Sequence, residues 1–118
     1  MVNYEPYIAR LKREKAKERK LAADRRKQAL QAAKQIAALL KQKFGAEQVF
    51  VFGSTLSEEY FRLHSDIDIA VKGLTAENFF RAYYEAYYAD HGFKVDLIDL
   101  RTCSDFLKRK IIQEGREL

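Results

Sequence analysis

Two stretches of the sequence determine the predicted fold: VFVFGST at residues 49–55 and SDIDIAV at residues 65–71. The first begins with four apolar, β-prone residues and ends in a turn at Gly53, which is typical of a buried strand. In the second, apolar residues alternate with Asp66 and Asp68, which is the period of two expected for a strand with one buried face. The two stretches therefore predict two strands of one small sheet.

A long helix is predicted before these strands. Residues 7–44 contain neither glycine nor proline and are rich in Ala, Lys, Arg, Gln, Glu and Leu, which are strong helix formers. Pro6 suits the first turn of a helix and Gly45 suits its C-terminal cap. We therefore expect one helix of about 35 residues in this region.

Three further elements are predicted after the second strand. Thr75 can cap a helix that runs to about Asp90. The phenylalanine and tyrosine residues of this helix form a stripe at four-residue spacing, which we interpret mainly as core packing, with part of it contacting a partner. Residues 93–100 predict a third strand and residues 104–114 a final helix. The order helix, strand, strand, helix, strand, helix indicates an α/β (α+β) domain with a small mixed sheet and a long N-terminal helix.

Composition limits the class of protein. The chain has 118 residues, 47% of them hydrophobic, which suits a single domain over residues 1–118. No apolar run reaches about 18 residues and the N-terminus lacks the features of a secretory signal, so we expect a cytoplasmic protein with no membrane contact. With one cysteine and two histidines, a metal would be held mainly by carboxylate oxygens, which favours Mg²⁺ over zinc.

The net charge of +5 is concentrated in one segment, because residues 10–27 carry ten Lys or Arg and only three acidic residues. Apolar positions at helical spacing become regular only from Ala29, so residues 1–28 are predicted to form a projecting basic helical extension. Three interpretations remain: a solvated helix with internal ion pairs, a docking element for a partner or for a second copy of the chain in a homo-oligomer, and nucleic-acid contact. Aromatic residues are absent from residues 10–27, which makes nucleic acid the least favoured.

The aspartates indicate a metal site. Asp66 and Asp68 lie on one face of their strand because side chains two residues apart point to the same side. Carboxylates that close repel each other unless a cation lies between them, and a divalent metal meets that need. Asp96 or Asp99 on the third strand could supply another ligand, but the two have opposite parity and spacing alone does not choose between them.

The turn at Gly53, Ser54 and Thr55 indicates a phosphate site. Glycine lets the backbone approach a ligand closely, and the next two residues offer hydroxyl and N–H donors. Each signal alone is common in proteins. Together, and each at a strand end, they favour phosphoryl or nucleotidyl transfer, in which the protein supplies positioning and charge neutralisation.

The stretches at residues 49–54, 65–71 and 94–99, with the helix at residues 107–115, resemble the DNA polymerase β-type nucleotidyltransferase superfamily, and most closely its minimal nucleotidyltransferase (MNT) branch. The resemblance covers about residues 30–118. It implies the polymerase β-type fold, two Mg²⁺ ions and ATP as substrate.

Specific roles follow from the resemblance. It implies that Asp66, Asp68 and Asp96 are the catalytic and metal-binding residues, which selects Asp96 over the other candidate on the third strand. It also implies that Gly53 and Ser54, with Thr55 beside them, bind the nucleotide phosphates, and that Asp96 helps to activate the attacking hydroxyl.

The resemblance also implies a partner. Minimal members of the family are similar to the antitoxin half of two-gene modules whose other half is a HEPN-domain RNase toxin, and some transfer AMP to a tyrosine of that toxin. We therefore expect Mg²⁺-dependent transfer of AMP from ATP to a tyrosine hydroxyl of a HEPN toxin. Two alternatives are a non-catalytic antitoxin that neutralises its partner by complex formation and a basic nucleic-acid-binding module.

Two departures from the family pattern motivate the non-catalytic alternative. The spacer between Ser54 and Asp66 has eleven residues where the family most often has ten. The common Arg-Gly pair near its start is replaced by LSEE at residues 56–59, which removes a glycine and adds two negative charges.

Overall fold

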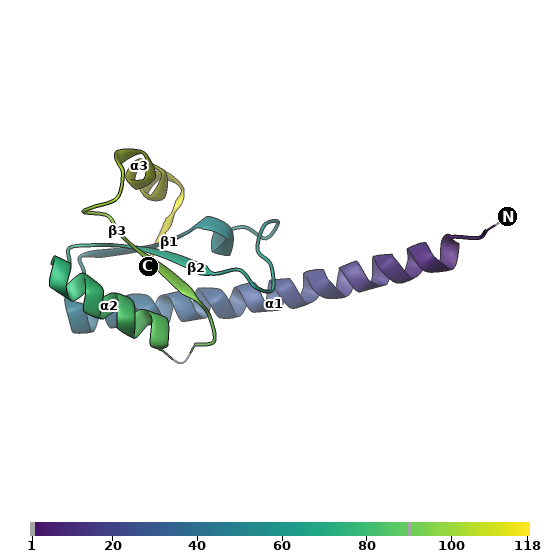
Figure 1. The fold of residues 1–118 in the computed structure, drawn as a ribbon, viewed down its shortest axis with the longest axis horizontal. Coiled ribbons are helices and arrows are strands. Elements are labelled where there is room, and N and C mark those ends of the chain that lie inside the picture. Colours follow the sequence, from purple (N-terminus) through teal and green to yellow (C-terminus); the bar gives the residue numbers. More distant parts are fainter. Residues whose placement is uncertain (1, 90) are drawn as a thin grey trace.

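The computed structural model describes residues 2–89 and 91–118 (Figure 1). Its elements in chain order are α1 (Glu5–Phe44), β1 (Gln48–Phe52), the short 3-10 helix η1 (Gly53–Leu56), β2 (Ile67–Lys72), α2 (Ala76–Tyr88), β3 (Val95–Asp99), α3 (Asp105–Glu114) and β4 (Arg116–Glu117). The predicted mixed α+β class, with a long N-terminal helix, is confirmed. The sequence did not predict η1 or β4.

The sheet has four strands in the order β3-β2-β1-β4. Strand β1 pairs antiparallel with β2 and with the short β4, whereas β2 pairs parallel with β3. The parallel pair requires a crossover connection, and α2 supplies it. The sheet is therefore mixed, with β3 and β4 at its two edges.

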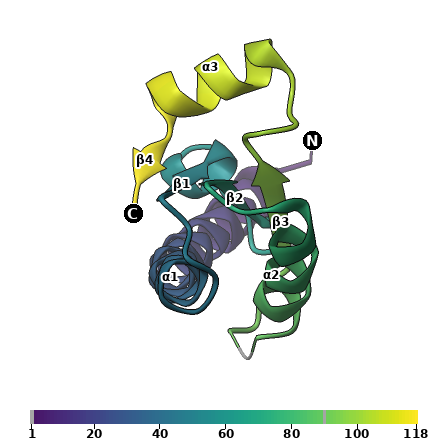
Figure 2. The same cartoon turned by 90° about the vertical axis from the view of Figure 1, so that its left-hand side faces the viewer.

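The domain has three layers (Figure 2). Helices α1 and α2 cover one face of the sheet, and α3 covers the other. Alternation along the strands supplies both faces: Val51 and Ile69 pack in the main core with α1 and α2, while Phe50 and Ala70 pack with Ile111 of α3. The strands therefore carry apolar residues on both faces.

Helix α1 has two different halves. Its buried residues begin at Ala29 and end at Leu40, and all residues from 2 to 21 are exposed. The exposed half extends away from the sheet (Figure 1), and the described residues span 68 × 31 × 18 Å. The helix is 40 residues long and ends at Gly45, whose φ of 74° suits glycine. No helix in the described part of the chain combines the length and the apolar character needed to cross a membrane.

Helix α2 corrects one interpretation. The hydroxyl of Thr75 accepts a hydrogen bond from the N–H of Asn78 at 3.2 Å, as expected for a cap, but the helix ends at Tyr88; Asp90 lies outside the described residues. Interpreting its aromatic stripe mainly as core was wrong. The buried residues of α2 are Ala82 and Ala86, and among its aromatic residues only Phe79 packs against the core. Phe80, Tyr84 and Tyr88 are 73%, 63% and 67% exposed. The small side chains of Ala82 and Ala86 let the helix lie close to the domain, so most of the large rings lie on its outer surface.

Candidate active site

The ends of three neighbouring strands meet at one end of the sheet. Because β1 is antiparallel to β2, the end of β1 at Phe52 lies beside Asp68 near the start of β2. Because β2 is parallel to β3, Asp96 lies in register with Asp68 on its other side. Asp66 immediately precedes β2, two residues from Asp68. The Gly-Ser turn and the three aspartates of the predicted site therefore lie at the same end of the sheet.

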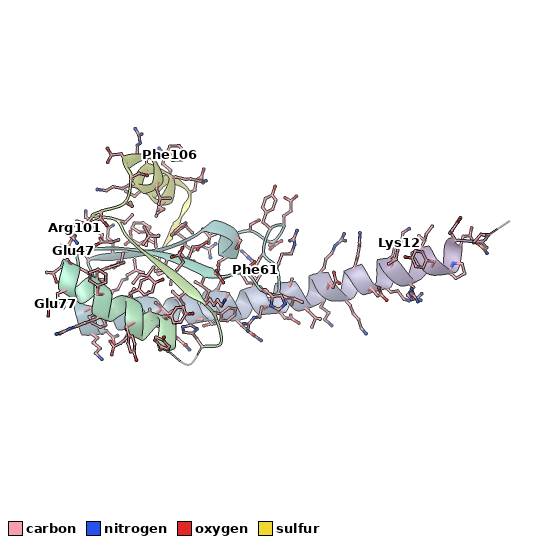
Figure 3. All side chains as sticks on the ribbon, in the orientation of Figure 1. Lys12, Glu47, Phe61, Glu77, Arg101 and Phe106 are labelled. Carbon is pink, nitrogen blue, oxygen red and sulfur yellow. The ribbon has the colours of Figure 1, made fainter. Side chains whose placement is uncertain are left out.

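The structure distinguishes Asp96 from Asp99, the two candidates on the third strand that the sequence spacing had left as alternatives. Asp96 has the same parity as Asp68, and both lie on the sheet face that packs against α3. Asp99 has the opposite parity and is 6% exposed; its carboxylate accepts hydrogen bonds from the backbone N–H of Arg101 at 2.9 Å and from its guanidinium at 3.3 Å. Arg101 lies at the end of the sheet away from η1 (Figure 3). The structure thus places Asp96, and not Asp99, beside Asp68; its role as a ligand stays a prediction.

Asp68 is in an unfavourable position for a negative charge. Burial, followed by the neighbouring carboxylates of Asp96 and Asp66, raises the pKa of its carboxyl from 3.8 to about 6. Asp66 and Asp96 are exposed, whereas Asp68 is partly buried between them. A bound cation would relieve both the repulsion and the cost of burial.

Gly53 connects the turn to this carboxylate. It has a φ of 74°, and a Cβ at this position would collide with the carboxylate of Asp68, whose Cγ lies 3.4 Å away. Only glycine combines this backbone conformation with such a close approach. The Gly-Ser turn is therefore packed directly against the most perturbed aspartate.

The three residues of the turn differ in exposure. Gly53 is exposed, Ser54 is partly exposed, and Thr55 is fully buried, with a hydroxyl that has no hydrogen-bond partner among the described residues. The turn is closed by the N–H of Ser57, which donates to the carbonyl of Ser54 at 2.9 Å. A ligand could therefore reach Gly53 and the side chain of Ser54, while Thr55 is out of its reach in this conformation.

The donor set fits Mg²⁺, although it is not a closed metal centre. Within residues 2–89 and 91–118, no three His, Cys, Asp or Glu side chains already converge on one point, even though Asp66 and Asp96 are close enough to raise the pKa of Asp68. The two observations agree if the exposed side chains of Asp66 and Asp96 turn inward when a cation binds. Mg²⁺ is usually bound by one or two carboxylates, with waters and substrate phosphates completing its shell.

A cleft of about 550 Å³ adjoins the turn. It lies between η1 and α3 and is lined by Phe52, Gly53, Leu56, Ser57, Tyr60, Leu107, Lys110, Ile111 and Glu114. Its volume is within the range of small-molecule sites. Lys110 brings a positive charge to it, and the sequence had not assigned this residue to the site; the only available signal was its place in the C-terminal helix that resembles the family.

A larger hollow of about 660 Å³ lies between the C-terminal part of α1 and α2, with Lys43 and Tyr84 among its lining residues. It contains none of the predicted site residues. The smaller cleft, which includes Gly53, is therefore the better candidate for a nucleotide site.

Comparisons with known proteins agree with this geometry. The family described as polymerase beta, nucleotidyltransferase, matches residues 34–118. No curated protein matches the sequence. Solved structures do match, and among them are structures of toxin–antitoxin pairs.

A toxin–antitoxin structure with AMP-PNP is 28% identical, with a TM-score of 0.59, over 72% of this chain and 70% of that chain. A mutant of the MntA–HpeT toxin–antitoxin pair is 26% identical, with a TM-score of 0.57, over 72% of this chain and 70% of that chain. The third is a structure of a tri-AMPylated Shewanella oneidensis HEPN toxin in complex with an MNT antitoxin; it is 26% identical, with a TM-score of 0.56, over 75% of this chain and 70% of that chain.

Proposed function

The chain belongs to the polymerase β-type nucleotidyltransferase family, and on this basis we propose that it transfers AMP from ATP to a tyrosine hydroxyl of a HEPN-domain toxin and so acts as an antitoxin. The observation that carries the proposal is the register of Asp68 with Asp96 beside Gly53. The similar solved structures support the choice of partner and nucleotide, because they include a toxin–antitoxin structure with AMP-PNP and a complex with an AMPylated toxin.

Nucleotide binding would use the turn and the cleft. The exposed Gly53 and the hydroxyl of Ser54 would meet the phosphates, and Lys110 would add a positive charge from α3. Asp66, Asp68 and Asp96 would hold two Mg²⁺ ions. Bound there, the ions would neutralise phosphate charge and favour the ionised form of the attacking hydroxyl.

The transfer itself requires one bond to form and one to break. The tyrosine oxygen attacks the α-phosphorus of ATP, the bond to the bridging oxygen breaks, and pyrophosphate leaves with that electron pair. Asp96 is exposed at the sheet edge and would accept the phenolic proton. In this proposal the acceptor tyrosine belongs to the toxin and would approach Asp96 from its exposed side.

The test is transfer of label from α-³²P-ATP. The protein is incubated with Mg²⁺, labelled ATP and a HEPN-domain toxin encoded beside it, and label is expected on the toxin. The double variant Asp66→Asn, Asp68→Asn should abolish labelling, whereas Asp24→Asn, at an exposed position of α1, should not change it. Equal labelling by the double variant would refute the assigned site.

A second candidate function is neutralisation by binding alone. Glu58 and Glu59 come after η1, separated from it by Ser57, and are exposed, so they place negative charge near the proposed phosphate site. If binding is sufficient, the double aspartate variant will form the complex and suppress toxin-dependent growth arrest as well as wild type does. If transfer is required, suppression will be lost while the complex still forms.

A further inference from the structure

Arg26 lies where the exposed half of α1 meets the folded domain. The residues of α1 before Ala22 are all exposed, and Ala29 is its first fully buried residue. The side chain of Arg26 is only 17% exposed. It precedes residue 34, at which the family match begins, so the matching region does not include it.

The side chain of Arg26 is bonded to the Gly-Ser turn. Its Nε donates a hydrogen bond to the backbone carbonyl of Thr55 at 2.9 Å, across 29 residues of sequence. Its Nη1 is also 4.0 Å from the carboxylate of Glu58. The side chain of Glu58 is 92% exposed, so solvent screens this ion pair and it contributes little. The bond to the carbonyl is therefore the main contact.

Thr55 depends on this contact. The residue is fully buried, and its hydroxyl has no hydrogen-bond partner among the described residues. Arg26 provides a donor for its carbonyl, and buried carbonyls that lose their donor are costly. Without the guanidinium, the turn would have to move until water reached the carbonyl. Such a movement would also displace Ser54, the adjacent residue.

We propose that Arg26 is a positioning residue for nucleotide binding: it holds η1 in the conformation in which Gly53 and Ser54 can bind phosphate. The inference rests on the proposed function, since it assigns Arg26 a role in that same site. The LSEE sequence that follows Thr55 contains no arginine. The guanidinium that contacts this turn comes instead from Arg26 of α1. A guanidinium suits the task because it stays charged and its planar donors are fixed in direction.

The neighbouring Arg25 provides a matched comparison. It is also partly buried, but it turns to another loop: its Nη2 donates to the carbonyl of Gly92 at 2.5 Å, and its guanidinium lies 3.6 Å from the centre of the Phe93 ring. Both arginines join α1 to the rest of the domain by hydrogen bonds, but of the two only Arg26 contacts the Gly-Ser turn. A purely structural role would give the two residues the same effect on nucleotide binding.

The test compares KM for ATP with kcat during AMP transfer. Arg26→Ala should raise KM by about five- to tenfold, the effect of one lost hydrogen bond, with kcat nearly unchanged. Arg26→Lys, which keeps the charge and a donor, should recover part of the loss. Arg25→Ala and the exposed control Lys27→Ala should leave KM unchanged. Equal changes in KM for Arg25→Ala and Arg26→Ala, or no change for Arg26→Ala, would overturn the proposal.

Two additions keep the outcome decisive. If Arg26→Ala does not fold, Arg26→Met is measured instead, because methionine fills a similar space but has no N–H donor for the Thr55 carbonyl, and it should raise KM in the same direction. Amide hydrogen exchange of residues 54–57 is followed in parallel and should be faster in the Arg26 variants only. If wild type transfers no AMP, the proposed function fails, and the exchange rates still decide whether Arg26 holds the turn.

Discussion

The substitution Asp68→Asn should stabilise the metal-free protein at neutral and alkaline pH while abolishing AMP transfer. Burial and two neighbouring carboxylates raise the pKa of Asp68 from 3.8 to about 6. A folded-state pKa above the unfolded value means that the folded state binds the proton more tightly. The contribution of Asp68 to the free energy of unfolding therefore becomes less favourable as pH rises from about 4 to about 6, and the full penalty remains above that range.

The size of the effect follows from the same pKa values. The rise from 3.8 to about 6 corresponds to at most about 3 kcal/mol of unfolding free energy. The side chain of Asp68 is partly exposed, so solvent screening reduces the expected gain to about 1–2 kcal/mol. Asparagine has nearly the same shape and no charge, so it removes the penalty without creating a cavity.

Urea unfolding followed by far-ultraviolet circular dichroism measures this difference. Without added metal, the Asn variant should be more stable than wild type by about 1–2 kcal/mol near pH 8, and the two should be equally stable near pH 3, where both the folded and the unfolded carboxyl are protonated. Asp24→Asn, at an exposed position of α1, serves as the control and should change stability by less than about 0.5 kcal/mol. A variant that is no more stable than wild type near pH 8, or one equally stabilised at both pH values, would refute the electrostatic reasoning.

Three further predictions concern the same site. Gly53→Ala should destabilise the protein by about 1–3 kcal/mol more than Gly45→Ala in thermal melts, because both glycines have a φ of 74° but only at Gly53 would the new Cβ collide with another residue. Equal losses would show that the packing of the turn on Asp68 is unimportant. Mg²⁺ should raise the melting temperature of wild type near pH 8 but not that of Asp68→Asn; an equal rise in both would place the metal elsewhere. Lys110→Ala should raise KM for ATP several-fold and leave the melting temperature unchanged, since the side chain is exposed; an unchanged KM would remove Lys110 from the site.

Local sequence signals were sufficient for most elements of the fold. Strands β1, β2 and β3 were evident from their runs of β-prone residues, whereas the two-residue β4 was not. Several helix ends were evident from single residues such as Pro6, Gly45, Thr75 and Ser104. These signals act within a few positions of the chain, so they can be found without knowing the tertiary structure. Which side of α2 packs against the domain could not be predicted in this way. Its apolar positions include both alanines and large aromatic residues, and which of them is buried depends on how closely the helix approaches the domain.

The candidate site required long-range information. Asp66 and Asp68 lie on one face because side chains alternate along a strand, and this could be predicted from the sequence. Selecting Asp96 depends on the register between β2 and β3, which spacing alone did not give. The contact of Arg26 with Thr55 joins residues 29 positions apart, and no local pattern indicates it.

The position of β3 at the edge of the sheet has a consequence for the behaviour of the protein in solution. An edge strand presents unpaired backbone N–H and C=O groups, which can template pairing with another chain. The exposed side chains of Lys94 and Asp96 bring opposite charges to this edge, and charged residues on edge strands discourage such aggregation. Replacing Asp96 with an apolar residue should therefore lower the solubility of the protein.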